Sequence, residues 1–187
     1  MEQMKEIENH IAYEQLKTKY DRVALDYVIM SVDTEYEGEI THKNAIIEAL
    51  QIINIRDAEC FGEDYIVSLE EEKMKACPSN MEELLQLPDD DYYDNRLKKN
   101  RAFSKPDTIP YWYAFLEPPH GNSYLKKDFI EFNEALFPNK SHCEVYRWND
   151  EFSNYFDAGK EWWGTGLWSV YDYLDRTMVI IGASLTD

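Results

Sequence analysis

The residues best suited to chemistry surround His120, in the segment 117–124 (Glu-Pro-Pro-His-Gly-Asn-Ser-Tyr). We expect this segment to link the end of a strand to the start of a helix, where free backbone N–H groups favour an anion. A histidine beside such a site can move protons near neutral pH. The same residues also make an ordinary turn with a solvent-exposed histidine, and the pattern favours that simpler interpretation.

A second group of candidates lies between residues 148 and 164, where acids are interleaved with aromatic residues. Asp150, Asp157 and Glu161 could act as a carboxylate pair or hold a hard cation. The acids do not alternate around a central glycine as in a calcium loop, and we predict no metal site. A hydrolase that combines His120 with these acids is an alternative hypothesis.

The aromatic residues of this region suggest a recognition surface instead of a catalytic site. Tryptophan and tyrosine anchor many protein interfaces. The candidate binding residues are Trp148, Tyr155, Trp162 and Trp163. Packing in the core, with the acids left in solvent, is the competing interpretation.

Other catalytic patterns are missing from the sequence. Ser184 lacks the G-x-S-x-G context of a nucleophilic serine. Cys143 follows His142, but neighbours along a strand point to opposite faces and do not form a dyad. There is no Walker loop, GxGxxG or HExxH, and we predict neither a cofactor nor an assigned catalytic residue.

The charge balance restricts the partners that we expect. The 187 residues contain 19 Lys and Arg against 37 Asp and Glu, a net charge of −18. A field of this sign repels phosphate backbones and anionic membrane surfaces, so we expect neither nucleic acid nor membrane as a partner. It attracts a basic protein.

The cysteines and the first residues indicate a cytoplasmic protein. Cys60, Cys77 and Cys143 are three in number and show no CxxC spacing, which fits a reducing compartment. The first residues are charged and lack the apolar region of a signal peptide.

Helical patterns dominate the first half of the chain. Apolar residues spaced by three and four predict amphipathic helix over residues 4–31, before an acidic loop at 33–39. The step of five from Ile11 to Leu16 indicates either a kink or a gap between two helices. A second helix is expected from Thr41 to about Asn54, with a buried stripe of Ala45, Ile46, Ala49, Leu50 and Ile53.

Two shorter helices are expected before the middle of the chain. Ser68 begins a capping box for a helix that ends before Pro78, and Ser79 or Asn80 caps another that runs to Leu87. Residues 88–107 change from acidic to basic, which indicates a linker or mobile loop.

Strand patterns appear after this segment. Residues 111–116 read as an aromatic strand, 125–137 as a helix capped by Ser123, and 143–148 as a second strand. The pattern of residues 163–184 predicts a β-hairpin. We expect it to lie inside the sheet, because its two strand-forming segments are the most apolar and aromatic in the chain. The sequence therefore predicts one α+β domain: a helical part over 1–87 and a mostly antiparallel sheet over 108–187.

The C-terminal residues resemble a signature of small bacterial proteins of unknown function. The matching residues are 154–157, 161–165, 168–172 and 181–187, and 118–121 fits the same pattern. The resemblance covers the last third to half of the chain and implies no activity and no functional residue.

Three functional hypotheses follow from these observations. The first is a non-catalytic acidic binding protein, an immunity-like inhibitor of a basic bacterial toxin, as the charge and the surplus of Trp and Tyr suggest. The second is the hydrolase described above. The third is a structural protein that forms homo-oligomers through the aromatic face of the hairpin.

Overall fold

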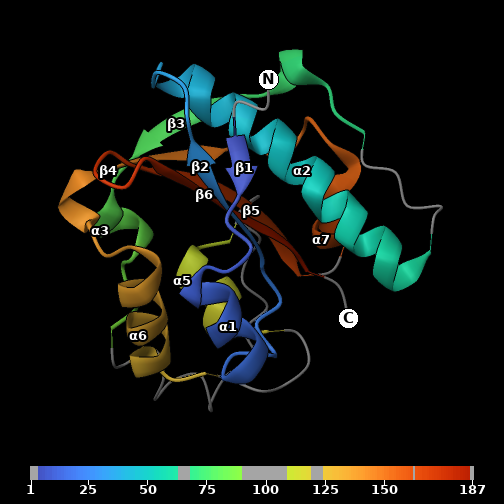
Figure 1. The fold of residues 1–187 in the computed structure, drawn as a ribbon. Helices are drawn as coiled ribbons and strands as arrows, with labels where there is room; N and C mark the ends of the chain where they lie inside the picture. Colours follow the sequence, from blue (N-terminus) through green and yellow to red (C-terminus); the bar gives the residue numbers. More distant parts are fainter. Residues whose placement is uncertain (1–3, 63–67, 90–108, 119–123, 162, 186–187) are drawn as a thin grey trace.

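A six-stranded antiparallel sheet organises the molecule (Figure 1). The computed structural model describes residues 4–62, 68–89, 109–118, 124–161 and 163–185. In chain order the strands are β1 (Met4–Glu6), β2 (Asp26–Val32), β3 (Ala76–Ser79), β4 (Cys143–Trp148), β5 (Gly164–Asp172) and β6 (Thr177–Leu185). Their order in the sheet is β1-β2-β6-β5-β4-β3, so the β5–β6 hairpin occupies the centre, as the sequence predicts.

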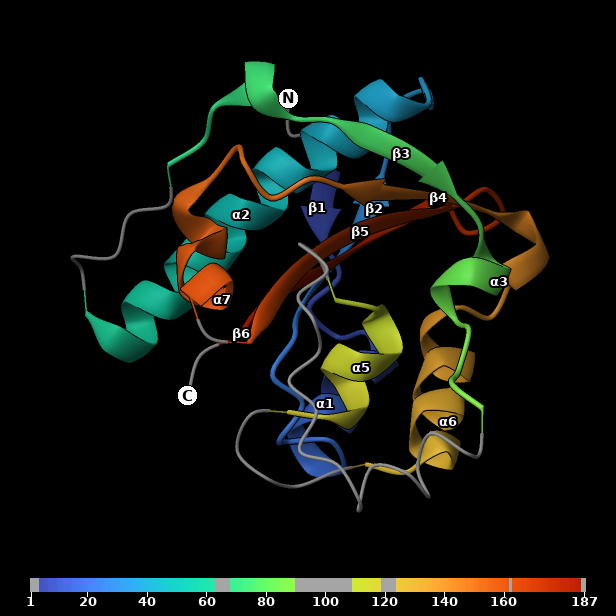
Figure 2. The ribbon, with the colours of Figure 1, turned by 180° about the vertical axis from the view of Figure 1, so that it is seen from behind.

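Helices cover both faces of the sheet (Figures 1 and 2). The helices are α1 (Ile11–Thr18), α2 (Glu39–Phe61), α3 (Met81–Leu84), α5 (Tyr111–Leu116), α6 (Lys126–Leu136) and α7 (Asp157–Glu161). Three short 3-10 turns are η1 (Glu71–Lys73), η2 (Lys140–His142) and η3 (Asn154–Phe156). The long helix α2 and the short α7 lie on one face, and α1, α5 and α6 lie on the other.

Each face carries its own hydrophobic core because side chains alternate along a strand. In β6, Val179 and Ile181 belong to the core under α1, α5 and α6, whereas Met178 and Ile180 belong to the core under α2. A strand that is covered on both sides reads as a continuous apolar run, which explains the sequence of β6.

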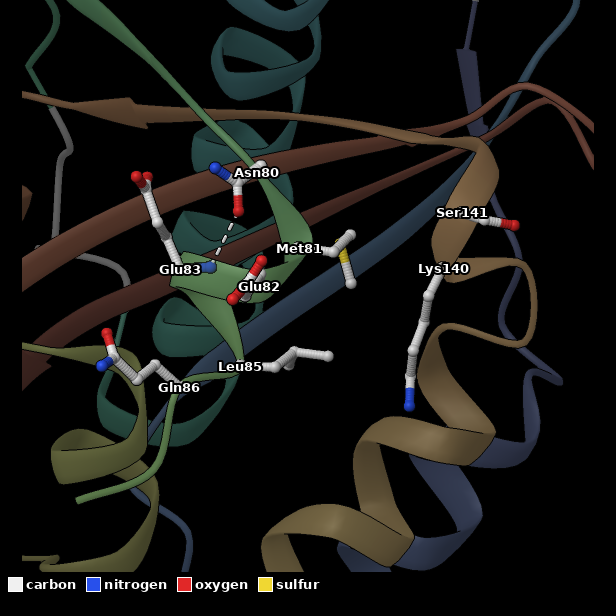
Figure 3. A pocket seen from close by; sticks show the side chains of 8 residues that line it. All are labelled: Asn80, Met81, Glu82, Glu83, Leu85, Gln86, Lys140 and Ser141. Carbon is white, nitrogen blue, oxygen red and sulfur yellow. Dashed lines mark hydrogen bonds between the residues drawn. The ribbon is translucent and has the colours of Figure 1, made fainter. Parts of the chain in front are cut away.

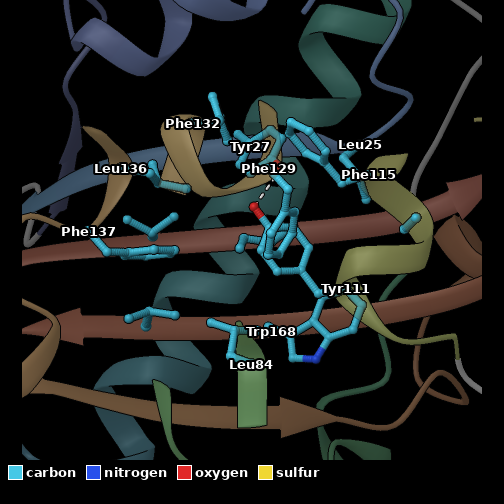
Figure 4. Close-up of a cluster of buried hydrophobic side chains, with 14 of the residues drawn as sticks. Leu25, Tyr27, Leu84, Tyr111, Phe115, Phe129, Phe132, Leu136, Phe137 and Trp168 are labelled. Carbon is cyan, nitrogen blue, oxygen red and sulfur yellow. Dashed lines mark hydrogen bonds between the residues drawn. The ribbon is translucent and has the colours of Figure 1, made fainter. Parts of the chain in front are cut away.

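The core under α6 is rich in aromatic side chains (Figure 4) and contains a buried polar group formed by Tyr27, Tyr111 and Asn133. The hydroxyls of Tyr27 and Tyr111 are 2.9 Å apart, and Tyr111 donates to Asn133 Oδ1 at 2.9 Å. The Asn133 amide donates to the carbonyl oxygen of Phe129 at 2.8 Å. Since these polar atoms are paired, their burial carries no large desolvation cost.

The predicted α+β class is confirmed, but the helical first half is wrong. Residues 4–31 contain β1 and β2 on either side of the short helix α1. In β2, Tyr27–Met30 and Val32 are all buried. A run of consecutive buried residues matches a helical spacing as well as a strand, so the pattern of three and four was misleading.

The helix predicted after Ser68 is also wrong. The chain forms only the turn η1 there, without a side-chain cap, and continues as β3. Pro78 lies within β3, opposite Tyr146. A proline is tolerated at this position because β3 is an edge strand, where one side of the backbone has no partner to bond.

Residues 111–116 form helix α5 and not the predicted strand. Pro110 stands at the N-cap, and Tyr111, Ala114 and Phe115 turn into the core. The ring of Tyr111 packs against Trp168 of β5 at 5.7 Å between ring centroids. Over six residues, the alternation of apolar side chains in a strand is hard to distinguish from the 3.6-residue repeat of a helix. Packing against the sheet decided for the helix.

Several local predictions are confirmed. The stripe of Ala45, Ile46, Ala49, Leu50 and Ile53 is buried, although α2 begins at Glu39 and Thr41 is not its cap. Asn80 caps α3, because its side-chain oxygen accepts a hydrogen bond from Glu83 N at 2.9 Å. The helix ends at Leu84 and is shorter than predicted. The predicted linker lies almost wholly outside the described residues, as does Ser123. None of the helices described is long and apolar enough to span a membrane.

Candidate functional site

The structure places the three candidate acids, Asp150, Asp157 and Glu161, just before and within α7. Asp150 accepts a hydrogen bond from Thr165 Oγ1 at 2.6 Å, and Asp157 and Glu161 are exposed at the two ends of α7. His120 lies outside the described residues, so the hydrolase hypothesis stays a prediction. No group of three or more His, Cys, Asp or Glu side chains suited to a metal occurs within the described ranges.

Two of the four predicted binding aromatics are core residues. Trp148 and Tyr155 are only 2% and 3% exposed and pack beneath α2, which corrects their assignment to a recognition surface. Trp163 is half-buried and stacks on Tyr113, with ring centroids 5.6 Å apart. Trp162 lies outside the described residues. Burial of large rings is expected where helices must cover a sheet, and it leaves these rings little surface for a partner.

A different cluster gathers at the end of the sheet where the β5–β6 turn lies. It consists of Tyr36, Glu144, Tyr146, Tyr171 and Tyr173, and we call it the tyrosine–glutamate cluster. Tyr36 comes from the loop before α2, Glu144 and Tyr146 from β4, and the other two from the end of β5 and its turn. Sheet register brings them together, because Glu144 lies opposite Tyr171.

The rings of the cluster hold one another in place. Tyr36 stacks on Tyr171 with centroids 4.0 Å apart and planes 2° apart. Tyr173 meets both rings edge-on, each at 5.1 Å. Such stacked and edge-to-face contacts stabilise aromatic groups beyond the effect of their buried area. Tyr173 nevertheless remains 47% exposed.

Glu144 is the charged centre of the cluster. Partial burial would raise the pKa of its carboxyl, but hydrogen bonds from Tyr173, Tyr36 and Tyr146 and the nearby His42 bring that pKa below its usual value. The hydroxyl of Tyr173 donates directly to Glu144 Oε2. Burial and this bond raise the pKa of Tyr173 to about 12. At neutral pH Glu144 is therefore a carboxylate, and Tyr173 is a neutral hydroxyl that donates to it.

A buried hydrogen-bond chain supports the cluster from behind. Trp148 Nε1 donates to Ser169 Oγ at 2.8 Å, and Ser169 Oγ lies 2.7 Å from His42 Nδ1. His42 Nε2 lies 2.8 Å from the hydroxyl of Tyr36. When Ser169 donates to Nδ1 and Nε2–H donates to Tyr36, the Tyr36 hydroxyl keeps its hydrogen for Glu144.

The Ser169–His42 pair has the spacing of a serine nucleophile and its base, but not its accessibility. Both residues are fully buried, and Trp148 already donates to the serine oxygen. Burial lowers the pKa of His42 to about 4, against the opposing charge of Glu144, so the ring is neutral at neutral pH. A substrate cannot reach this hydroxyl, and the pair positions Tyr36 instead.

Exposed acidic side chains flank Tyr36 along the chain. Asp33, Glu35, Glu37 and Glu39 are all exposed, whereas Tyr36 between them turns inward. Within the part of the chain that the structure describes, none of these four carboxylates forms an ion pair. Unpaired acids around a fixed aromatic group make this end of the sheet a local centre of negative potential.

Local geometry fixes the acidic loop in this position. Gly38 has φ of 63°, which favours glycine, and its carbonyl oxygen accepts from the backbone N–H groups of Thr41 and His42. Thr41 Oγ1 accepts from Glu37 N at 2.8 Å. Arg176, in the β5–β6 turn, donates to the carbonyl oxygen of Thr34 at 2.7 Å. The loop is thereby tied both to α2 and to the hairpin.

A second titratable group lies at Asp26, near the start of β2. Burial and the charge of Asp57 raise its pKa to about 6, although Tyr155 donates to it at 2.6 Å. Nearby, Arg56 pairs with Glu6 and donates to the carbonyl oxygen of Tyr27 at 2.9 Å. This group consists of residues already bonded to one another, and it suits a structural role.

The Tyr155–Asp26 bond depends on a glycine. A Cβ atom on Gly182 would lie 2.4 Å from the Tyr155 hydroxyl oxygen. We expect Gly182→Ala to lower the free energy of unfolding by about 1–3 kcal/mol, measured by urea denaturation. Tyr155→Phe removes the clashing atom, so the double variant should lose less than the sum of the single losses. Simple additivity would contradict this explanation.

A groove beside the edge strand β3 is a further candidate (Figure 3). Its volume is about 830 Å³, and it lies between α3 and η2. Its lining consists of Asn80, Met81, Glu82, Glu83, Leu85, Gln86, Lys140 and Ser141. The side chain of Asn80 accepts a hydrogen bond from the backbone N–H of Glu83, and the carboxylate of Glu83 accepts one from the hydroxyl of Ser79. The ammonium group of Lys140 pairs with the carboxylate of Glu134. Because Asn80, Glu83 and Lys140 already have partners, they are not free to recognise a ligand in this groove.

The sequence patterns missed every residue of the tyrosine–glutamate cluster. The acidic loop at 33–39 is visible in the sequence, and its single central tyrosine is the one signal that points to the site. His42 and Ser169 carry no such signal, because 127 residues separate them. Their proximity follows from packing of α2 on β5.

A comparison of the chain with models of known protein families finds no match, and a comparison with curated proteins finds no similar sequence. The resemblance of the C-terminal residues to small bacterial proteins stays a prediction. Function is therefore argued from the site itself.

Proposed function

We propose that this chain is a non-catalytic acidic binding protein whose partner is a basic protein. The observation that carries the proposal is the tyrosine–glutamate cluster with its rim of four exposed acids. We further propose that the role is immunity-like, in which the chain binds and inhibits a basic bacterial toxin. The net charge of −18 supports a basic partner over a neutral one.

The surface around the cluster has the composition of an interface. Tyr173 and its neighbour Leu174 are 47% and 58% exposed, and Ile40 in the first turn of α2 is 58% exposed. Exposed large apolar groups within a polar, charged rim are typical of surfaces that bind proteins. The acids of the rim steer a basic partner toward these apolar groups.

Affinity capture tests the proposal. We expect the immobilised chain to retain proteins of high isoelectric point from its native host at about 0.05 M salt and to release them at about 0.5 M, because salt screens surface charges. The retained proteins are identified by mass spectrometry, and each is assayed for toxicity with and without this chain. A chain of equal charge, such as a polyglutamate-tagged carrier, controls for simple ion exchange.

Three outcomes of the affinity capture would contradict the proposal. If the chain retains the same proteins as the carrier, or if no retained protein loses activity when the chain is added, the inhibitor role is wrong. Retention of acidic or neutral proteins would contradict the charge argument itself.

A further inference from the structure

We propose that the tyrosine–glutamate cluster binds an arginine side chain of the basic partner. This proposal rests on the proposed function and specifies its anchor. The guanidinium would lie on the exposed ring of Tyr173 and donate a hydrogen bond to the carboxylate of Glu144.

The charge of Glu144 lacks a cationic partner in the described structure. The ion pairs formed by the described residues involve other acids, and the donors to Glu144 are neutral tyrosine hydroxyls. His42 behind the cluster is fully buried. A carboxylate has about four acceptor positions, and the hydrogen bond from Tyr173 leaves room for another donor. A half-buried carboxylate of this kind is stabilised further by an external cation.

Tyr173 provides a flat surface next to this carboxylate. Its hydroxyl donates to Glu144, so the ring and the charge are adjacent. The ring is held edge-on by Tyr36 and Tyr171, and close to half of the side chain still faces solvent. A cation above an aromatic face is attracted by the negative face of the ring. Because the ring is already fixed, binding costs little side-chain entropy.

The geometry favours arginine over lysine. A guanidinium is planar and can stack on the tyrosine ring while an N–H in its plane reaches a neighbouring carboxylate. A lysine ammonium is more strongly hydrated and cannot stack, so it gains less from the ring. The exposed acids of the rim attract either cation and do not discriminate between them.

Titration with two small probes tests the site. N-acetyl-argininamide and N-acetyl-lysinamide are added separately to the wild-type chain, and binding is followed through the backbone amide signals of Glu144 and Tyr173. We expect the arginine probe to shift these signals at lower concentration than the lysine probe. We expect Glu144→Gln to weaken arginine binding about tenfold, the size of effect of one charge-assisted hydrogen bond.

Glu14→Gln is the matched control. It removes the same charge from α1, on the opposite face of the sheet, where Glu14 is exposed. We expect arginine binding to this variant to stay within about twofold of the wild type. Equal weakening by both substitutions, or equal binding of the two probes, would show a diffuse field and overturn the proposal.

Tyr173→Ala and Tyr173→Phe provide a second test that does not alter the charge. Tyr173 lies in an exposed turn, so either change leaves the core intact. We expect alanine to abolish the preference for arginine and phenylalanine to retain most of it, because only alanine removes the ring. A retained preference in Tyr173→Ala would overturn the stacking arrangement.

The outcomes separate this proposal from the proposed function. A basic partner captured equally well by wild type and Glu144→Gln overturns the arginine anchor and leaves the binding function in place. Arginine-specific shifts at Glu144 and Tyr173, without capture of any basic protein, overturn the binding function and leave the arginine site in place.

Discussion

Replacing Phe132 by alanine should lower the free energy of unfolding by about 3–5 kcal/mol, the usual loss for a fully buried phenylalanine. Phe132 is completely buried between α6 and the sheet (Figure 4). Its ring centroid lies 5.2 Å from that of Tyr27 and 5.4 Å from that of Phe115. Truncation leaves a cavity among rings that the sheet and α5 hold in place, so little relaxation can fill it.

Ile130→Ala on the same helix is the matched control. Ile130 is 50% exposed on the solvent side of α6, and its truncation should change the free energy of unfolding by less than about 0.5 kcal/mol. Urea denaturation followed by tryptophan fluorescence and circular dichroism measures both variants. Equal losses at the two positions would mean that the aromatic core under α6 is not closely packed.

The second large effect that we expect is a dependence of stability on pH through His42. Burial lowers the pKa of this residue from 6.5 to about 4. A group whose pKa is depressed by folding contributes stability above its unfolded pKa and loses it as the pH falls toward its folded pKa. The contribution of His42 is therefore complete at pH 7 and declines between pH 6.5 and 4, by about 3 kcal/mol in total.

Comparison with His42→Gln isolates this effect. Carboxyl groups whose pKa does not depend on His42 are present in both proteins and cancel in the difference, as does Asp26, whose raised pKa of about 6 acts in the opposite direction. Urea denaturation at several pH values should show the wild type losing its advantage over the variant between pH 6.5 and 4. A difference that is independent of pH would mean that His42 is not held in its neutral form.

Local patterns were sufficient for those elements whose sequence and neighbours agree. The hairpin of β5 and β6, the strand β4, the helix α6 and the buried stripe of α2 all follow from residues close together in the chain. The hydrophobic spacing and the strand formers of each segment point to one structure, and tertiary packing reinforces it.

Local patterns failed where two structures fit the same residues. The apolar run of β2 was predicted as helix, the short helix over residues 111–116 was predicted as a strand, and the residues before Pro78 were predicted as helix although they lead into the edge strand β3. In each case the outcome depended on where the segment lies within or against the sheet, and the residues of a single segment do not specify that location.

The sequence by itself determined the acidic character of the protein, its α+β class and its central hairpin. The tertiary structure decided which residues form a site: it buried Trp148 and Tyr155 in the core, and it joined Tyr36, Glu144 and Tyr173 from three separate segments. Hydrophobic patterns and turn signals act between neighbours in the chain, whereas the distance between side chains of different strands depends on sheet order and register.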